Sequence, residues 1–177
     1  MKFKFSPAVT GFIFLLTMFN NSAIAEGQLD DATILAIFDE ANSVDIYTGW
    51  LGAMRGNSED VRALGRMAAT DHVAVQQMGR DLAKKLNIIP TPPDNDSSVA
   101  DHAKAISLLQ SETGVEFDKA YLRQEIIFHQ SVIDAVKDTL LPAIKNGELR
   151  ELVKNVLPGF EHHLAETKAV AKKMGVK

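Results

Sequence analysis

Residues 61–86, VRALGRMAATDHVAVQQMGRDLAKKL, carry the pattern that decides the fold. One inner row recurs along this stretch at alternating steps of 4 and 3: Val61, Gly65, Ala68, His72, Val75, Gly79, Leu82 and Leu86. Positions spaced in this way lie on one stripe of an α-helix, and the regular alternation is typical of a helix packed along a bundle. Ser58 and the two acidic residues after it suit a helix start, because a serine side chain can cap free N–H groups.

Three further segments carry the same helical spacing. The first runs from Asp30 to the RGNSED turn and has the row Ile34, Phe38, Ala41, Val44 with Asp45, Thr48 and Leu51. The third begins near Phe117, ends around LLPAIKNGE and has the row Leu122, Ile126, His129, Ile133, Val136 and Leu140. The fourth runs from Glu148 to Met174 with the row Leu149, Leu152, Val156, Phe160, His163, Thr167, Val170 and Met174.

The connections between these segments set the topology. Short turns at residues 56–57 and 146–147 join the first pair and the last pair of helices, so the members of each pair run antiparallel. The stretch IIPTPPDNDSS ends the second helix, and a shorter helix over residues 99–112 follows it before Gly114, an expected C-cap. The sequence therefore predicts an all-α antiparallel four-helix bundle, with a short extra helix in the connection between helices 2 and 3.

The N-terminal segment has a pattern of its own. Residues 1–25 contain two early lysines, an apolar run over residues 9–19 and the small-x-small sequence Ala23-Ile24-Ala25, which together are typical of a cleaved secretory signal peptide. The apolar run is shorter than the roughly 20 residues that a membrane-spanning helix needs. We therefore expect cleavage of residues 1–25, a single mature domain over residues 26–177 and a periplasmic or secreted location.

Composition excludes several classes of protein. The chain has no cysteine, so disulfides, thiolate metal sites and a lipid-modified cysteine are excluded. Removal of residues 1–25 takes away two lysines and no acidic residue, which changes the formal net charge from −4 to −6. Proteins that bind nucleic acids usually present a basic face to the phosphates, which an acidic domain lacks. No apolar run after residue 25 is long enough to cross a membrane. We expect no nucleic-acid partner and no membrane span after cleavage, and the sequence identifies no partner.

Three histidines fall on inner rows of three different helices. His129 lies about 18 residues before the turn at residues 146–147 and His163 about 16 after it, so in an antiparallel pair they are nearly level. His72 lies about 15 residues before the end of the second helix, and His129 lies about 12 after the start of the third. His162, next to His163, points about 100° away and should lie on the flank. We predict that His72, His129 and His163 meet in one layer.

Two carboxylates are candidates for the same layer. Asp45 on the first helix is offset from His72 by roughly 6 Å along the bundle, and Glu125 lies one turn before His129. Three imidazoles with one carboxylate would suit a zinc, copper or iron ion, with Asp45, Glu125 or water as the fourth ligand. In the alternative, the histidines form a core network, hydrogen-bonded to one another, to Tyr47 or Tyr121, or to water.

Other kinds of site find less support. Carboxylate-bridged dinuclear sites use Glu-x-x-His on two helices, but Ala69, Ile126 and Phe160 stand three residues before the histidines. No nucleophile motif or glycine-rich phosphate loop is present, so the sequence does not indicate an enzyme. Asp71 is expected to face solvent or a basic neighbour, because residues adjacent on a helix diverge.

Three stretches resemble a known family. They are VRALGRMAATDHVAVQQMGRDLAKKLN, GVEFDKAYLRQEIIFHQSVI and VLPGFEHHLAETK, and they are similar to the bacterial secreted family called domain of unknown function 4142. Its members are often labelled outer-membrane proteins and have a ferritin-like helical bundle, so the resemblance implies that fold and compartment. The recurring histidines of the family fall on His72, His129 and His163, while its usual glutamate is Asp45 here.

Two functional hypotheses follow. In the first, the chain is a periplasmic or secreted bundle that holds a metal ion through His72, His129 and His163 and serves envelope stress protection or metal handling. In the second, it is a non-enzymatic structural or interaction module whose histidines form a pH-sensitive network. A metal-dependent oxidoreductase or hydrolase is a third reading, which would need an open coordination position.

Overall fold

The structure is a computed structural model that describes residues 29–94 and 96–176. Within these ranges every regular element is helical, which confirms the all-α prediction. The elements are α2 (Asp31–Arg55), α3 (Glu59–Leu86), α4 (Ser98–Ser111), α5 (Gly114–Ala135), the π-helical turn η1 (Val136–Leu140), α6 (Leu141–Ala143) and α7 (Gly147–Lys173). The expected signal segment, residues 1–25, lies outside the described residues.

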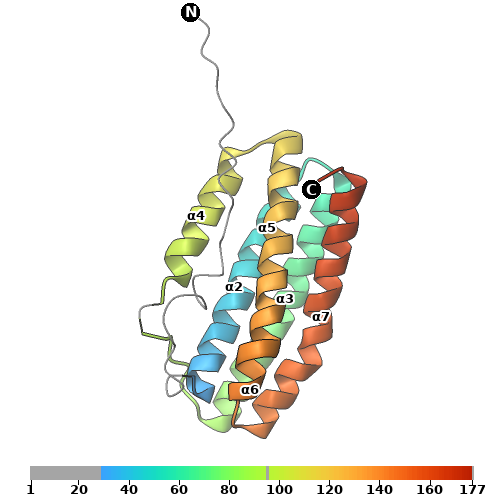
Figure 1. Cartoon of the computed structure of the whole chain (residues 1–177). Coiled ribbons are helices and arrows are strands. Elements are labelled where there is room, and N and C mark those ends of the chain that lie inside the picture. The colour runs from blue at the N-terminus through green and yellow to red at the C-terminus, as the bar shows by residue number, and fades with distance from the viewer. Residues whose placement is uncertain (1–28, 95, 177) are drawn as a thin grey trace, which may run out of the picture.

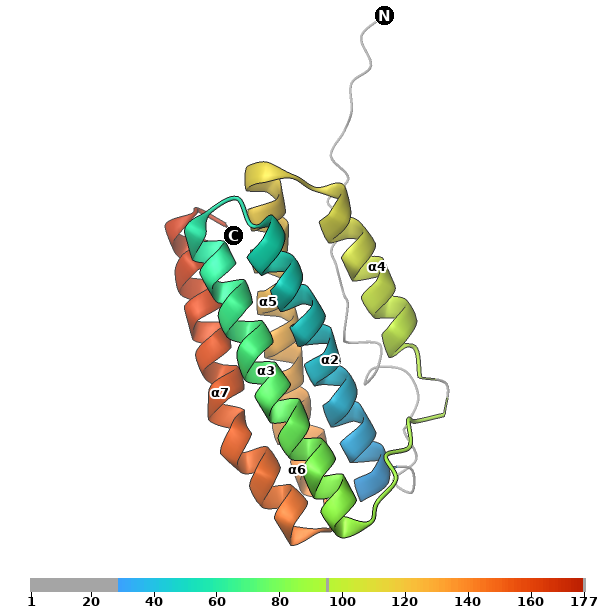
Figure 2. The ribbon, with the colours of Figure 1, turned by 180° about the vertical axis from the view of Figure 1, so that it is seen from behind.

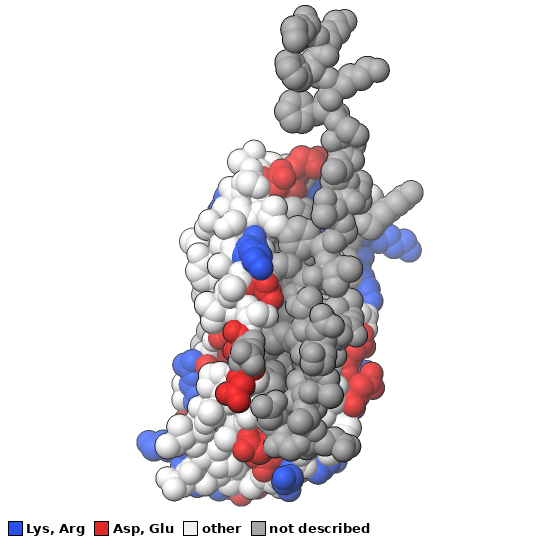
Figure 3. All heavy atoms as spheres, turned by 60° about the vertical axis from the view of Figure 1, so that its left-hand side comes forward, with Lys and Arg blue, Asp and Glu red and all other residues white. Residues whose placement is uncertain are grey.

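The long helices α2, α3, α5 and α7 lie side by side as a bundle (Figure 1). The α2 helix is antiparallel to α3, and α5 is antiparallel to α7, whereas α3 and α5, which are joined through α4, run in the same direction. Contacts join α2 to α3, α3 to α7, and α7 to α5, whereas α2 and α5 contact each other sparsely. The shorter α4 lies outside, where it contacts α5 and α2 (Figure 2). On the side that carries α4, acidic and basic side chains are interspersed over the described surface (Figure 3).

Carboxylates tie the two short turns to distant helices. The Asp118 carboxylate, on α5, accepts the N–H groups of Asn57 and Ser58 at 2.7 and 2.8 Å, in the turn between α2 and α3. At the other end of the bundle, the Asp31 carboxylate on α2 accepts the N–H groups of Lys145 and Asn146 at 2.8 and 2.9 Å. These bonds satisfy free N–H groups near helix starts and fix the helices at defined levels along the bundle.

Glycines allow α2 and α3 to approach closely. A methyl group at Gly65 of α3 would overlap the α2 backbone at Gly49 and Ala53. The backbone on both sides of this contact belongs to regular helix, so neither side can move without disturbing its own hydrogen bonds. The two helices are therefore held at a spacing that only glycine permits at residue 65.

Alanine at Gly65 should destabilise the protein, and alanine at Gly159 should not. We expect Gly65→Ala to lower the free energy of unfolding by about 2–3 kcal/mol, because overpacking shifts backbone. A methyl group at Gly159, in the middle of α7, meets nothing within 4 Å. Gly159→Ala should therefore raise the free energy of unfolding by about 0.5–1 kcal/mol through its better helix propensity. Urea unfolding of both variants measures the contrast, and equal effects would contradict the close contact.

Some element boundaries differ from the sequence prediction. The third long helix begins at Gly114 (φ +57°), not near Phe117, so Gly114 opens α5 instead of capping the helix before it. Toward its end, the π-helical turn η1 replaces the expected α-helix, and its closing bond runs from the Leu141 N–H to the Val136 carbonyl. Pro142, which has no N–H to donate, follows at once. The α7 helix continues through Pro158.

Candidate functional site

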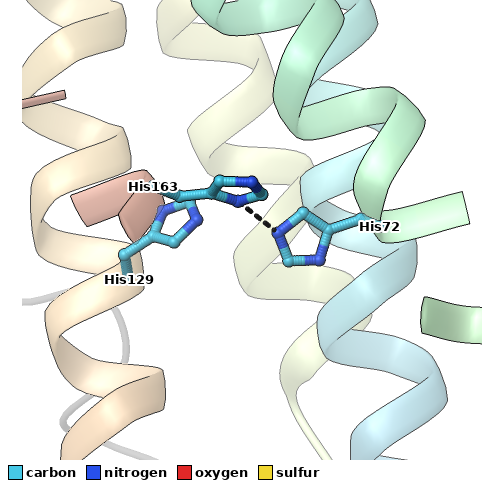
Figure 4. Close-up of side chains that lie close together, drawn as sticks. All are labelled: His72, His129 and His163. Atoms are coloured by element: carbon cyan, nitrogen blue, oxygen red, sulfur yellow. Dashed lines mark hydrogen bonds between the residues drawn. The ribbon is translucent and has the colours of Figure 1, made fainter. Parts of the chain in front are cut away.

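Three histidine rings meet inside the bundle, which confirms the predicted layer (Figure 4). His72 comes from α3, His129 from α5 and His163 from α7, and their exposed fractions are 1%, 1% and 4%. The ring centroids are 5.0–5.7 Å apart. His162 is exposed on the flank of α7, as expected.

A buried amide fixes the His72 ring. Asn42 on α2 is fully buried, and its Nδ2 donates to the Phe38 carbonyl at 2.7 Å. The amide oxygen therefore faces His72, where it lies 2.8 Å from Nδ1. An amide oxygen can only accept, so Nδ1 of His72 carries the proton and Nε2 keeps its lone pair.

The other two rings are oriented by acceptors as well. Nδ1 of His129 donates to the Glu125 carbonyl at 3.0 Å, which leaves the lone pair on Nε2. Nε2 of His163 lies 3.0 Å from Oδ2 of Asp71 on α3, so Nε2 is the donor and Nδ1 faces inward. Nδ1 of His163 and Nε2 of His72 are 3.1 Å apart. Each imidazole thus has one nitrogen held by an acceptor outside the group and one that points into it.

The α2 helix adds a carboxylate to the same point. Asp45 is fully buried, and its Oδ2 lies 3.3 Å from Nε2 of His72 and 3.8 Å from Nε2 of His129. No donor among the described residues lies in hydrogen-bond geometry to either Asp45 oxygen, and Nε2 of His129 has no partner either; the Glu125 carboxyl group is the neighbour that interacts with Asp45 and raises its pKa. Unpartnered buried polar atoms are rare in proteins, and these three converge.

Glu125 lies on the far side of His129. It is 2% exposed, and its Oε2 is 3.6 Å from Nδ1 of His129, the nitrogen that is already bonded to a carbonyl. Ligand atoms of Asp45, Glu125 and His129 also lie within 4.8 Å of one another. We call His72, His129, His163, Asp45 and Glu125 the histidine–carboxylate cluster. Of its two acids, Asp45 is the one placed among the inward-facing nitrogens.

Burial shifts the protonation of the cluster toward neutral forms. It raises the pKa of Asp45 well above its ordinary value, with Glu125 adding to the effect, and it raises the pKa of Glu125 to about 7. Burial, together with the neighbouring imidazoles, lowers the pKa of His72 to about 2 and that of His129 to about 4. At neutral pH both of these imidazoles are therefore uncharged, which is the form that binds metal ions.

The raised pKa of Glu125 predicts a pH-dependent effect of Glu125→Gln in the metal-free protein. The pKa of Glu125 is higher in the folded protein than in the unfolded chain, so the folded state binds this proton more tightly. The stability that Glu125 contributes is therefore complete below pH 4.5 and is lost as pH rises through about 7. We expect the variant to match the wild type near pH 4.5 and to exceed its free energy of unfolding by about 3 kcal/mol at pH 8.

Urea unfolding across this pH range in the presence of a chelator measures the difference between the two chains. The lowered pKa values of His72 and His129 act in the opposite direction, since their stabilising effect is lost as pH falls. Both chains share these histidines, so that contribution cancels in the comparison. Parallel curves for the two chains would show that Glu125 ionises as freely in the folded protein as in the unfolded one.

The structure gives two residues roles that the sequence did not predict. Asn42 had no metal-site signature, and only its place one turn before Asp45 could have drawn attention to it. Asp71 was expected to face solvent or a basic neighbour. Its side chain is 56% exposed, yet it bonds His163 of the neighbouring α7 rather than a residue of its own helix. Tyr47, one suggested partner of the histidines, is half exposed, and its ring contacts His102.

The spacing of these atoms is suited to a metal ion. Two ligands of a tetrahedral zinc ion, each about 2.05 Å from it, lie about 3.3 Å apart. The separations of His72 Nε2 from His163 Nδ1 and from Asp45 Oδ2 are 3.1 and 3.3 Å. Ligand atoms of the three histidines all lie within 4.8 Å of one another. The cluster could therefore hold an ion with small movements of its side chains.

Fold and cluster together define a class: an all-helical bundle with histidines and carboxylates buried between its helices. The chain belongs to the family described as Domain of unknown function (DUF4142), whose model matches residues 18–170. No curated protein and no solved structure matches the chain. None of the described helices combines the length and the apolar character that a bilayer crossing requires.

Proposed function

We propose that this chain is a periplasmic or secreted protein with a ferritin-like four-helix bundle that binds one transition-metal ion at the histidine–carboxylate cluster. The role proposed for it is metal handling or envelope stress protection. The observation that carries the metal site is the orientation of the rings. Histidines that bind metals donate their second N–H to a carboxylate, carbonyl or similar acceptor, and all three histidines have such an acceptor here.

Charge supports the same proposal. The ionised form of Asp45 is costly without a cation, because the side chain is fully buried, lies beside the Glu125 carboxyl group and faces nitrogen lone pairs that cannot donate to it. A cation at this point would interact favourably with the carboxylate and with all three lone pairs. Asn42, the Glu125 carbonyl and Asp71 would hold the rings in the required orientation, and the surrounding helices would exclude water.

The donor set narrows the choice of ion. Three imidazoles and a carboxylate suit zinc, copper or iron, and a site of this kind binds Cu²⁺ more tightly than Zn²⁺. Glu125 stands four residues before His129, not three, and no Glu-x-x-His pair accompanies it. A single-ion site is therefore favoured over a carboxylate-bridged pair. A bound ion would supply a positive charge, and a Lewis acid if a ligand position stayed open.

The alternative proposal is an interaction module without metal. The short distances from His72 to His163 and to Asp45 support it, since these groups could exchange protons within the core. In this reading the pH of the compartment, rather than an ion, would change the packing of α3 against α7. Metal content separates the two proposals.

The deciding experiment is elemental analysis of protein purified from the native periplasm without an affinity tag. The variant is His163→Ala, and the matched control is His162→Ala, which removes the exposed histidine next to it. About one ion per chain in the wild type and the control, and loss of that ion from the folded variant, would establish the site. If the purified protein contains no metal and also fails to take up zinc, copper or iron, the metal site is contradicted and the interaction module is the remaining proposal.

A further inference from the structure

A cavity of about 440 Å³ lies between α2, α4 and α5 and extends to α7. Most of its wall is apolar, with side chains that include Ile37, Val44, Phe128, Val132, Val136 and Phe160. Sites for small molecules typically measure about 300–1,000 Å³ and have such walls with a few polar groups. The sparse contact between α2 and α5 is consistent with a space between these two helices.

Two polar atoms of the cavity wall have no partner. Oγ of Ser98 and Nε2 of His102 are buried, and neither makes a hydrogen bond within the part of the chain that the structure describes. Both residues lie on α4 and line the cavity, and Ser98 is 5% exposed. Buried polar atoms normally have partners, so this pair indicates a ligand that can form hydrogen bonds. The histidine–carboxylate cluster accounts for neither atom.

The charged residues of the cavity wall restrict the ligand further. They are Asp39, Glu40, Asp96, Asp101 and Arg80. The Arg80 guanidinium is bonded to the Asp39 carboxylate at 2.6 and 3.0 Å, so these two charges compensate each other. Asp101 is paired with Lys104 at 2.9 Å. Glu40 and Asp96 remain, so the net charge of the wall is negative and an anionic ligand would be repelled.

We propose that this cavity binds an uncharged amphiphile: a compact apolar molecule whose single polar group, such as a hydroxyl, bonds Ser98 Oγ and His102 Nε2. The apolar walls from α2, α5 and α7 would take up its hydrocarbon part, and α4 would provide the polar contact. None of the five residues of the histidine–carboxylate cluster lines this cavity, although Asn42, which holds His72, belongs to its wall, and ligand binding does not require an ion.

The test uses the protein released by cells that express the full chain, in the presence of a chelator. The neutral fluorophore N-phenyl-1-naphthylamine is the probe, and 2-naphthol and naphthalene are competitors that differ by one hydroxyl. We expect the probe to bind at micromolar concentration and 2-naphthol to displace it about 10-fold more effectively than naphthalene, as one good hydrogen bond allows. In the double variant Ser98→Ala/His102→Leu this preference should disappear, while naphthalene should bind as before.

A filled cavity provides the second readout. Val132→Trp on α5 should abolish probe binding, and Arg123→Trp, which adds the same ring to the exposed face of α5, should not. If circular dichroism shows that Val132→Trp does not fold, Ala105→Phe fills the cavity from α4 instead. No probe binding to the wild type, or equal binding to the filled and control variants, would overturn the proposal. An unchanged preference for 2-naphthol in the double variant would overturn the role of Ser98 and His102.

Discussion

Zinc should raise the midpoint of thermal unfolding of the metal-free wild type by about 5–10 °C when its free concentration is about a hundred times its Kd. An ion that binds only the folded state at this excess adds about 2.7 kcal/mol to the free energy of unfolding. For a chain of this size, each kcal/mol corresponds to about 2–4 °C. The effect should be large because the ligands come from α2, α3, α5 and α7, so the unfolded chain has no preformed site.

Replacement of one inward histidine should remove this stabilisation. In His163→Ala the midpoint should not change with zinc, whereas His162→Ala, the exposed neighbour, should respond like the wild type. Differential scanning calorimetry with and without zinc measures all three proteins. If His163→Ala gains as much stability from zinc as the wild type, the ion binds elsewhere, for instance at surface carboxylates, and the cluster is not its site.

The second large effect is expected from Asp45→Asn, which should change stability and zinc affinity in opposite directions. Without metal, the amide N–H can donate to the lone pairs of His72 and His129, which Asp45 can do only in its protonated form, and that form becomes costlier to maintain as pH rises. The free energy of unfolding at pH 8 should therefore rise by about 1–3 kcal/mol. Zinc affinity should fall on the order of 100-fold, since loss of a ligand costs at least as much as loss of the group that orients one.

Urea unfolding in a chelator and competition with a zinc indicator give the two quantities. Glu116→Gln is a matched control, because Glu116 is exposed and pairs only with Lys119 of its own helix among the described residues. It should change neither quantity by more than a few tenths of a kcal/mol. Loss of stability in metal-free Asp45→Asn would show that the carboxylate already has a favourable partner in the core.

Helix periodicity predicted the helices and the rows on which His72, His129 and His163 lie, and counting from the turn at residues 146–147 placed His129 and His163 at one level. The count that related His72 to His129 took the end of the second helix and the start of the third to be level. They lie at opposite ends of the bundle, because α4 leads the chain back along it (Figure 1). Asp118 and Asp31 fasten the two short turns, so little sliding of the helices is possible. Asp45 was harder to place, because counting from the turn at residues 56–57 left Asp45 about one helical turn away from the level of His72.

The spacing of apolar residues in the sequence could not predict which side chains of different helices contact each other. Asp71 and Asn42 act on rings of other helices, and one-dimensional spacing does not say which flank faces which neighbour. On α3, Gln76 is buried, whereas Val75, which belongs to the predicted inner row, is only partly buried. Gln76 faces α2, because its Nε2 donates a hydrogen bond to Oγ of Ser43 on that helix. The cavity was equally invisible, because it depends on how far α2 and α5 stand apart.

The burial of the cluster has a kinetic consequence. Its histidine side chains are at most 5% exposed, and Asp71, which bonds His163, is the exposed one among the described side chains that hold the three rings. An ion could enter or leave only while neighbouring helices stand apart, so the residence time of the ion would follow the rate of that opening. Dilution or a strong chelator in the surroundings would then draw metal out slowly. Such a protein would carry its ion between encounters instead of equilibrating with the surrounding pool.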